Sequence, residues 1–347
     1  MGEIMILQAI CLCLMSPAGA GTEAQRDPWT WPFAVDSIWN TPIGSEARFV
    51  PARLNGAPHI GLDVEYLVVT KSTDPVEPVF PPSSWNKRWP GDTKRKLGEL
   101  HVPAALVIPD AKEGSTPNGC SAFLMPDGRT VKQLEPTCRL AEGGHLVGWL
   151  REDQDIFGPG IYGTHWGSGL STLGGSIRKG ELVGNRPIRH AIKLNVWGDQ
   201  LYYGADVKGF RWPADRSDSG APSGYHGKNP KLVMGALLAL QPNLTTASLG
   251  IRSELGKKLF HVLQDYGAYI SDDSGWDHYD LCAEVGVQEE VQQKYGTPIG
   301  FNSGSYRDEL MSMITNLAIV DNNSVVSVGG GGIRRMPLAP PFLKIGK

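Results

Sequence analysis

Two histidines and one pair of oppositely charged residues are the first groups in this chain whose types suit catalysis. His165 stands near the start of a glycine-rich segment, THWGSGLSTLGGSIRKGEL, which ends with Arg178 and Glu181. His190 precedes a mostly apolar run, residues 191–197. Histidine titrates nearest to neutral pH, so each ring can act as a general acid or base. For each histidine taken alone, a structural role such as capping a core strand is favoured over catalysis, and a local ion pair is the simplest explanation of Arg178 and Glu181.

The glycine-rich segment fails the spacing tests for nucleotide and serine chemistry. A phosphate-binding P-loop ends in Lys-Ser or Lys-Thr, and no such pair closes the glycines at 158–163. The dinucleotide spacing is missed because Gly167 and Gly169 are followed next by Gly174. No serine of the segment stands at the centre of a Gly-x-Ser-x-Gly elbow. The glycines therefore indicate tight turns and close backbone approach, with any chemistry in the polar residues between them.

Further candidates lie in loop-like stretches where aromatic and charged residues mix, at 202–218 and 265–279. Aromatic rings stack on sugars, and charged groups bond hydroxyls or carboxylates. A loop anchored by one tryptophan, or an Asp-rich turn, is the structural alternative. The catalytic candidates are His165, His190, Arg178, Tyr203, Glu181 and Asp215, and the substrate-binding candidates are Trp166, Asn195, Arg211, Trp212, Arg216, Tyr269 and Asp272.

The sequence predicts no metal and no cofactor. Paired acids such as Asp272 and Asp273 are of the type that ligates Ca²⁺, but neighbours on a strand point to opposite faces. The cysteines beyond residue 20, Cys120, Cys138 and Cys282, lack the spacing of a zinc site. In an oxidising compartment we expect a Cys120–Cys138 disulfide across a hairpin, with three free thiols as the alternative.

Composition and the N-terminus predict a secreted or periplasmic globular protein. The 347 residues are 41% hydrophobic and 20% charged, and the net charge of −3 supplies no basic field for nucleic acid. Residues 1–20 resemble a secretory signal peptide, with an apolar stretch and small residues before a cut after Ala20. Residues 21–347 then form a single secreted domain, which we expect to be monomeric and, after cleavage, without a membrane span.

Periodicity predicts a mainly β fold with a few C-terminal helices (α+β), built on a β-sandwich or jelly-roll-like core. The Trp- and Pro-rich stretch 21–50 is expected to be an extended arm over this core. Pro126-Asp127-Gly128 lies between two strand-like runs and predicts a hairpin. Apolar spacing predicts helices at 253–266, 285–295 and 307–317.

Four motifs in a specific order carry a family resemblance. GSGLSTLGGSIRKGEL, IRHAIKLN, RWPA and LQDYGAYISDD are similar to the motifs of a family of uncharacterised secreted bacterial proteins, some found in polysaccharide-degrading settings. The resemblance covers about residues 30–340. It implies one secreted domain, and it assigns neither an established activity to the chain nor a function to any residue.

The residue types favour a polysaccharide lyase that cleaves a uronate-containing polysaccharide by β-elimination. This reaction needs a cation at the uronate carboxylate, a base for the C5 proton and an acid for the leaving oxygen. We expect His165 or His190 to be the base, Arg178 to neutralise the carboxylate, and a tyrosine such as Tyr203 to be the acid.

Two alternatives stay open. A glycoside hydrolase needs two carboxylates flanking the scissile bond, and Glu181, Asp215 and Asp272 are the candidates. A non-catalytic carbohydrate-binding module needs only aromatic platforms, and the chain has ten tryptophans.

Overall fold

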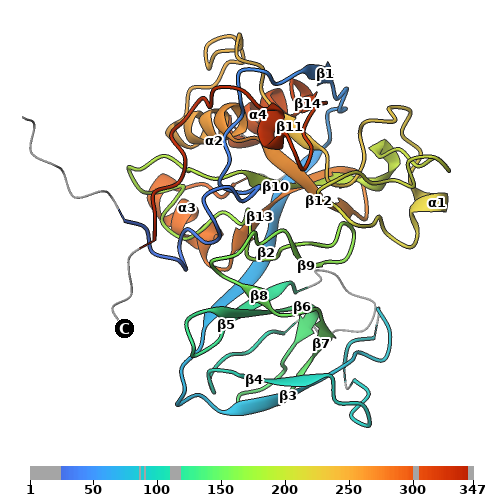
Figure 1. Ribbon diagram of the computed structural model, residues 1–347, viewed down its shortest axis with the longest axis vertical. Helices are drawn as coiled ribbons and strands as arrows, with labels where there is room; N and C mark the ends of the chain where they lie inside the picture. The colour runs from blue at the N-terminus through green and yellow to red at the C-terminus, as the bar shows by residue number, and fades with distance from the viewer. Residues whose placement is uncertain (1–24, 86, 90, 110–118, 300–304, 343–347) are drawn as a thin grey trace, which may run out of the picture.

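Strands outnumber helices, and the longer helices come late in the chain. The computed structural model describes residues 25–342 apart from 86, 90, 110–118 and 300–304, so the predicted signal peptide at 1–20 lies outside the described residues. The mainly β class with a few C-terminal helices is confirmed (Figure 1). The elements are β1 Phe49–Pro51, β2 His59–Val69, β3 Val76–Phe80, β4 Gly98–His101, β5 Ser121–Leu124, β6 Thr130–Cys138, β7 Leu146–Leu150, β8 Gln154–Asp155, β9 Tyr162–His165, β10 Ile192–Trp197, η1 Gly198–Gln200, α1 Ala221–Gly224, β11 Leu237–Ala239, α2 Glu254–Asp265, β12 Ala268–Ser274, β13 His278–Glu284, α3 Val287–Tyr295, α4 Ser305–Thr315, β14 Ala318–Val320 and η2 Val328–Gly330.

In the described part of the chain, thirteen strands form one continuous mixed sheet. Its order is β1-β14-β11-β12-β10-β13-β2-β5-β6-β7-β3-β4, with β8 beside β6. The pairs β10–β12, β13–β2, β2–β5 and β3–β7 are parallel. A jelly roll is built from antiparallel strands, so these parallel pairs distinguish the sheet from the sandwich or jelly-roll-like core that we expected.

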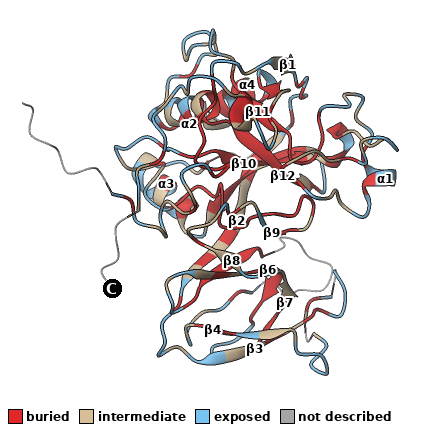
Figure 2. Ribbon diagram, in the orientation of Figure 1, coloured by how far each residue is buried: buried red, intermediate tan, exposed pale blue. Residues whose placement is uncertain are grey.

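Strand β2 joins two lobes. Its residues 59–65 pair with β13 in the upper lobe of Figure 1, and its residues 66–69 pair with β5 in the lower lobe. A large hydrophobic core fills the upper lobe, and a smaller one around Val79, Phe123 and Leu134 fills the lower lobe. Helix α2 packs on α4 and β11, and α4 packs on β2. Buried residues concentrate on the central strands β10 and β12, so most of their side chains are screened from water (Figure 2).

The helices begin and end where their sequences predict. Ser253 Oγ accepts a hydrogen bond from the amide of Gly256, which caps the start of α2. Gly267, at φ +80°, follows its end in a backbone conformation that favours glycine. Helices α3 and α4 fall within two residues of the ranges predicted for them.

The predicted hairpin is present, and its register explains why the expected disulfide is not formed. β5 and β6 are antiparallel, and Ser121 pairs with Leu134. This register places Cys120 beside Glu135, three positions before Cys138. Both cysteines are buried, and no disulfide joins them in the described residues.

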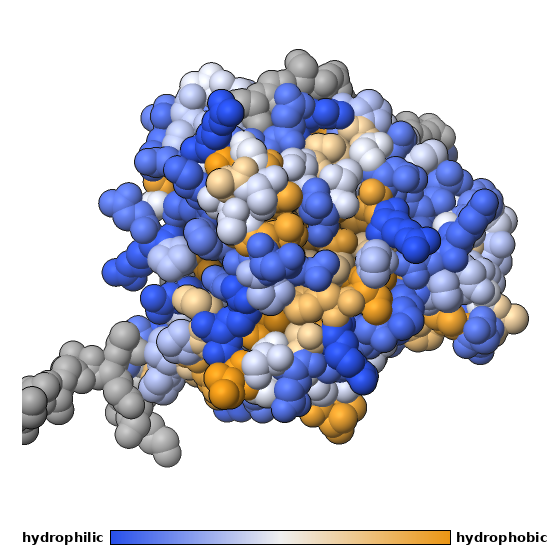
Figure 3. Space-filling view, turned by 90° about the horizontal axis from the view of Figure 1, so that it is seen from above, coloured by the Kyte–Doolittle hydropathy of each residue, from blue (hydrophilic) through white to orange (hydrophobic). Residues whose placement is uncertain are grey.

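One face of the molecule is predominantly polar. Seen from above, hydrophilic side chains cover most of the face, and apolar side chains gather in a band across its middle (Figure 3). Among the described residues, none of the helices combines the length and the apolar run needed to cross a bilayer.

Candidate functional site

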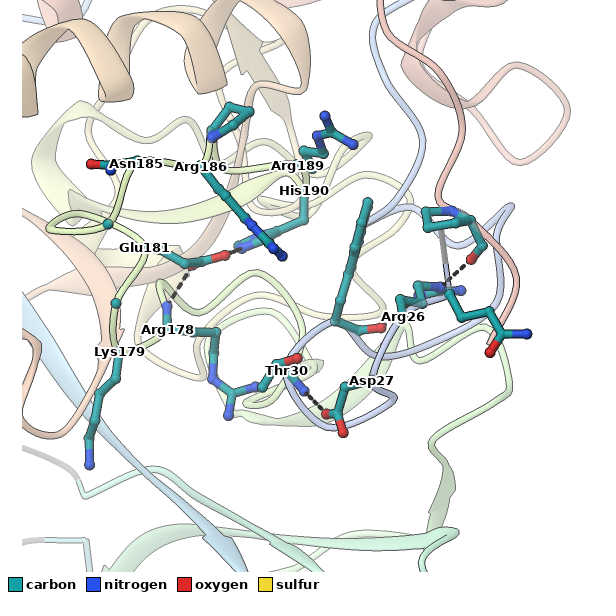
Figure 4. A pocket seen from close by; sticks show the side chains of 16 residues that line it. Arg26, Asp27, Thr30, Arg178, Lys179, Glu181, Asn185, Arg186, Arg189 and His190 are labelled. Atoms are coloured by element: carbon teal, nitrogen blue, oxygen red, sulfur yellow. Dashed lines mark hydrogen bonds and ion pairs between the residues drawn. The ribbon is translucent and has the colours of Figure 1, made fainter. Parts of the chain in front are cut away.

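One cavity, of about 990 Å³, has more positively than negatively charged side chains in its lining (Figure 4). The N-terminal arm forms one wall, and residues 178–190 form the other. Five arginine or lysine residues line it against two carboxylates. This excess of positive charge favours an anionic ligand. The charged lining residues are Arg26, Arg178, Lys179, Arg186, Arg189, Asp27 and Glu181.

His190 and Glu181 form a charged pair inside this cavity. Nε2 of His190 lies 3.1 Å from both carboxylate oxygens of Glu181, and Nδ1 lies 2.9 Å from the carbonyl oxygen of Ala191. Burial lowers the pKa of His190, but the charge and hydrogen bonds of Glu181 outweigh burial and raise the pKa above its usual value. Both ring nitrogens thus face oxygen acceptors, and the pair favours the protonated imidazole more than water does.

The arginines around this pair play different parts. Arg178 is almost fully buried, and its guanidinium donates to Glu284 at 2.9 Å and to the carbonyl oxygen of Trp29 at 2.6 Å, so it braces the cavity wall. Arg186 is exposed, and its side chain extends towards the His190–Glu181 pair (Figure 4). A ligand anion at His190 would therefore meet Arg186 first.

A second polar site is buried on the central strands. Asp63 and Glu65 on β2, Cys282 on β13, and Lys193 and Asn195 on β10 share one face of three adjacent strands. Nδ2 of Asn195 donates to Asp63 at 2.9 Å, and its Oδ1 lies 3.6 Å from the sulfur of Cys282. Burial raises the pKa of Asp63 to about 6. Polar groups thus cross the middle of an otherwise apolar sheet.

A fully buried ion pair forms the centre of this face. Lys193 Nζ donates to Glu65 at 2.5 Å and to the carbonyl oxygens of Ser171 and Thr172. His165, from the end of β9, places Nε2 2.7 Å from the same Glu65 oxygen. Burial raises the pKa of Glu65, but the Lys193 charge and the hydrogen bonds outweigh burial and leave it lowered. We therefore describe Glu65 as ionised and as the group that orients both Lys193 and His165.

Acidic groups surround the other nitrogen of His165. Nδ1 lies 3.5 Å from Oδ2 of Asp272, and oxygens of Asp218, Asp272 and Asp273 lie within 4.8 Å of one another. Burial and the neighbouring carboxylates raise the pKa of Asp272 well above its usual value and that of Asp273 to about 7. Tyr225 donates its hydroxyl to Asp218 at 2.5 Å.

The glycines of residues 164–182 let the chain lie directly on this acidic face. A Cβ at Gly167 would lie 2.2 Å from Oδ1 of Asp272. Gly175 has φ +75°, and a Cβ there would lie 2.5 Å from the ring of Trp39. The close approach that we inferred from the glycines is therefore present at both positions.

Three other predicted residues form a cluster beside the buried face. Asp215 pairs with Arg151 and with Arg216, and Arg216 stacks over Trp166 with its guanidinium carbon 5.0 Å from the ring centroid. Burial raises the pKa of Asp215, but the two arginines outweigh burial and lower it. Asp215 is thus a poor proton donor and a structural partner of these arginines.

The four remaining predicted residues belong to the scaffold. Tyr269 is 1% exposed and packs edge-on against Trp39, at 5.5 Å between ring centroids. Tyr203 and Trp212 are half-buried against the large core. Arg211 donates to the carbonyl oxygen of Asp321 at 2.8 Å.

The predicted site residues therefore fall into distinct groups. Arg178, Glu181 and His190 share the cationic cavity, whereas His165, Asn195 and Asp272 belong to the buried polar face. Glu181, Asp215 and Asp272, the hydrolase candidates, each have different partners.

Sequence reasoning missed Glu65, Lys193 and Arg186. The first two had a signal in the sequence, because LDVEYLVV and IKLNVW each carry polar residues at alternate positions of an apolar strand. Arg186 stands in a loop and had none.

No known protein family, characterised protein or solved structure matches this chain.

Proposed function

We propose that the protein is a lyase that binds a uronate-containing polysaccharide in the cationic cavity and cleaves it by β-elimination. The observation that supports this proposal most directly is the meeting of Arg178, Glu181 and His190 in one positively charged cavity. A polyuronate carries one carboxylate per sugar, so an excess of arginine and lysine along the wall matches its charge.

His190 is the proposed acid–base group. In its neutral form, with the ring turned away from the Glu181 oxygens that Nε2 contacts, Nε2 removes the proton at C5, the electron pair forms the C4–C5 double bond, and the C4–O bond breaks. The imidazolium then returns the proton to the leaving oxygen, which requires both groups on the same face of the sugar. No tyrosine lines the described cavity, so one residue carries both proton transfers in this mechanism.

Arg186 is the proposed partner of the uronate carboxylate, because it is exposed and reaches the pair. Neutralising this carboxylate makes the C5 proton more acidic, and a guanidinium can do so with two parallel hydrogen bonds. Arg178 positions Glu181: its backbone amide donates to a Glu181 oxygen at 2.7 Å.

The test is an ultraviolet assay for the unsaturated uronate product on polygalacturonate, alginate and glycosaminoglycans. We expect His190→Ala to lower kcat by about 10²–10⁴, the usual contribution of a general acid–base group. Because Glu181 raises the pKa of His190, the rate should rise with pH through that pKa, and Glu181→Gln should shift the rise to lower pH.

The matched control is His226→Ala. His226 forms an exposed pair with Asp199 at 2.6 Å, outside this cavity, and its loss should leave kcat unchanged. Full activity in His190→Ala would refute the assignment. Reducing ends without a double bond would favour the hydrolase, and tight binding without turnover would favour the binding module.

A further inference from the structure

A distinct constellation of metal-binding groups surrounds Nδ1 of His165. The sulfur of Cys120 lies 3.8 Å from Nδ1, and Oδ2 of Asp272 lies 3.5 Å from it. One ligand atom each from Cys120, Glu135 and His165 lie within 4.8 Å of one another. Four bonds of about 2.0–2.3 Å to one tetrahedral ion would place ligands about 3.3–3.8 Å apart, which matches the distances of Cys120 and Asp272 from Nδ1.

Each of the two carboxylates uses one oxygen to accept a hydrogen bond from a backbone amide. Oε2 of Glu135 accepts from the amide of Trp166 at 3.0 Å, whereas Oε1 is buried and has no hydrogen-bond partner among the described residues. Oδ1 of Asp272 accepts from the amide of Asp273, and Oδ2 faces His165. A buried carboxylate oxygen without a partner is costly, and a bound cation would supply the missing partner.

His165 has a carboxylate at its far ring nitrogen, an arrangement common in metal-binding histidines. Oε1 of Glu65 lies 2.7 Å from Nε2, and Lys193 Nζ lies 3.0 Å from the same nitrogen. In the tautomer that donates from Nε2 to Glu65, the lone pair of Nδ1 is directed at Cys120 and Asp272. A carboxylate on the far nitrogen fixes the ring and makes the near nitrogen a better ligand. The same Glu65 receives the Lys193 ammonium, so the neighbouring group of Glu65, His165 and Cys282 already contains a positive charge.

We propose that Cys120, Glu135, His165 and Asp272 bind one divalent transition-metal ion of the zinc type. A thiolate and an imidazole nitrogen select a borderline-soft ion over Ca²⁺ or Mg²⁺, and the carboxylates supply the remaining charge.

Cobalt(II) is the probe that tests this directly. The protein is purified with chelator, titrated with Co²⁺ and Zn²⁺, and followed by absorption spectroscopy and elemental analysis. We expect one ion per chain, a thiolate-to-cobalt charge-transfer band, and displacement of cobalt by zinc. Cys120→Ser should abolish the band, and Glu135→Gln should weaken binding at least tenfold, the usual loss when a ligand sphere is disturbed.

Cys282→Ser is the matched control, because Cys282 is an equally buried thiol on the Lys193 side of His165. It should keep the band and the stoichiometry. Circular dichroism of each variant verifies folding, and Glu135→Gln remains informative if Cys120→Ser does not fold. Loss of the band in Cys282→Ser but not in Cys120→Ser would overturn the proposal. So would a stoichiometric ion without a thiolate band, or no stoichiometric ion at all. None of these outcomes depends on lyase activity.

Discussion

His165 and His190 lie 25 positions apart in one chain segment, yet they occupy opposite electrostatic settings. His190 faces an open cavity with an excess of arginine and lysine, and one carboxylate balances its own charge. His165 is fully buried, and carboxylates outnumber the single lysine that reaches it. The glycine-rich segment thus begins at His165 in an acidic interior and leads to a cationic surface around His190.

The class of ligand at each histidine follows from the uncompensated charge around the ring. Excess arginine and lysine at His190 favours an anion, and excess carboxylate at His165 favours a cation. Exposed arginines are stable without a bound anion because water solvates their charge. Buried carboxylates have no water, so they need a fixed ammonium, a proton or a metal ion. Lys193 supplies the ammonium on the Nε2 side of His165, and we assign a metal ion to the Nδ1 side.

The largest expected effect follows from the buried side of this comparison. Lys193→Met removes the ammonium from a fully buried pair and leaves Glu65 charged and uncompensated, so we expect a loss of about 3–5 kcal/mol in the free energy of unfolding. Urea denaturation at neutral pH measures it. The double variant Lys193→Met/Glu65→Leu should lose less than Lys193→Met alone, because no buried charge then lacks a partner.

Lys231→Met is the surface counterpart. Lys231 Nζ lies 2.7 Å from Asp321, a distance similar to that of the buried pair, but its side chain is 45% exposed. Water replaces the lost contact, so we expect a change of about 0–1 kcal/mol. Equal losses in Lys193→Met and Lys231→Met would contradict the contrast between buried and open charges.

A smaller effect is expected in the cavity. Arg186→Ala should weaken binding of an oligouronate about tenfold, since a hydrogen bond to a charged group contributes about 1.5–3 kcal/mol and exposure reduces it. Calorimetry at low salt measures the affinity, and the difference should shrink as salt rises. Arg252→Ala, an exposed arginine outside the cavity, should bind as the parent does.

The sequence predicted the elements better than it predicted the site. Helices and the hairpin follow from local signals: the Ser253 cap, Gly267, and the Pro-Asp-Gly turn. The parallel pairing of β10 with β12 and of β13 with β2 depends on long crossovers that leave no local trace. The predicted disulfide is absent for a related reason. The register of β5 against β6, which the sequence does not reveal, places Cys120 beside Glu135 and not beside Cys138.

The candidate sites divide in the same way. Arg178, Glu181 and His190 are close in sequence, and the prediction grouped them. Cys120, Glu135, His165 and Asp272 come from four distant positions, so ligand spacing, which argued against zinc, had no bearing on a site assembled by the fold.

The smallest expected effect concerns the stability contributed by the His190–Glu181 pair. The folded protein raises the pKa of His190 above its unfolded value of about 6.5, so the folded state binds the proton more tightly. Stability from this pair is therefore fully present below about pH 6.5 and is lost as the pH rises through the folded pKa. His190→Gln should lower the melting temperature below that pH and have less effect at alkaline pH, with a free-energy difference of about 1 kcal/mol or less.

Glu181→Gln should reproduce this pH dependence, and the double variant should add little, because the carboxylate is the cause of the shift. If His190→Gln were equally destabilising at every pH, the ring would act in the cavity wall by packing alone, and the contrast with His165 would rest on the buried site only.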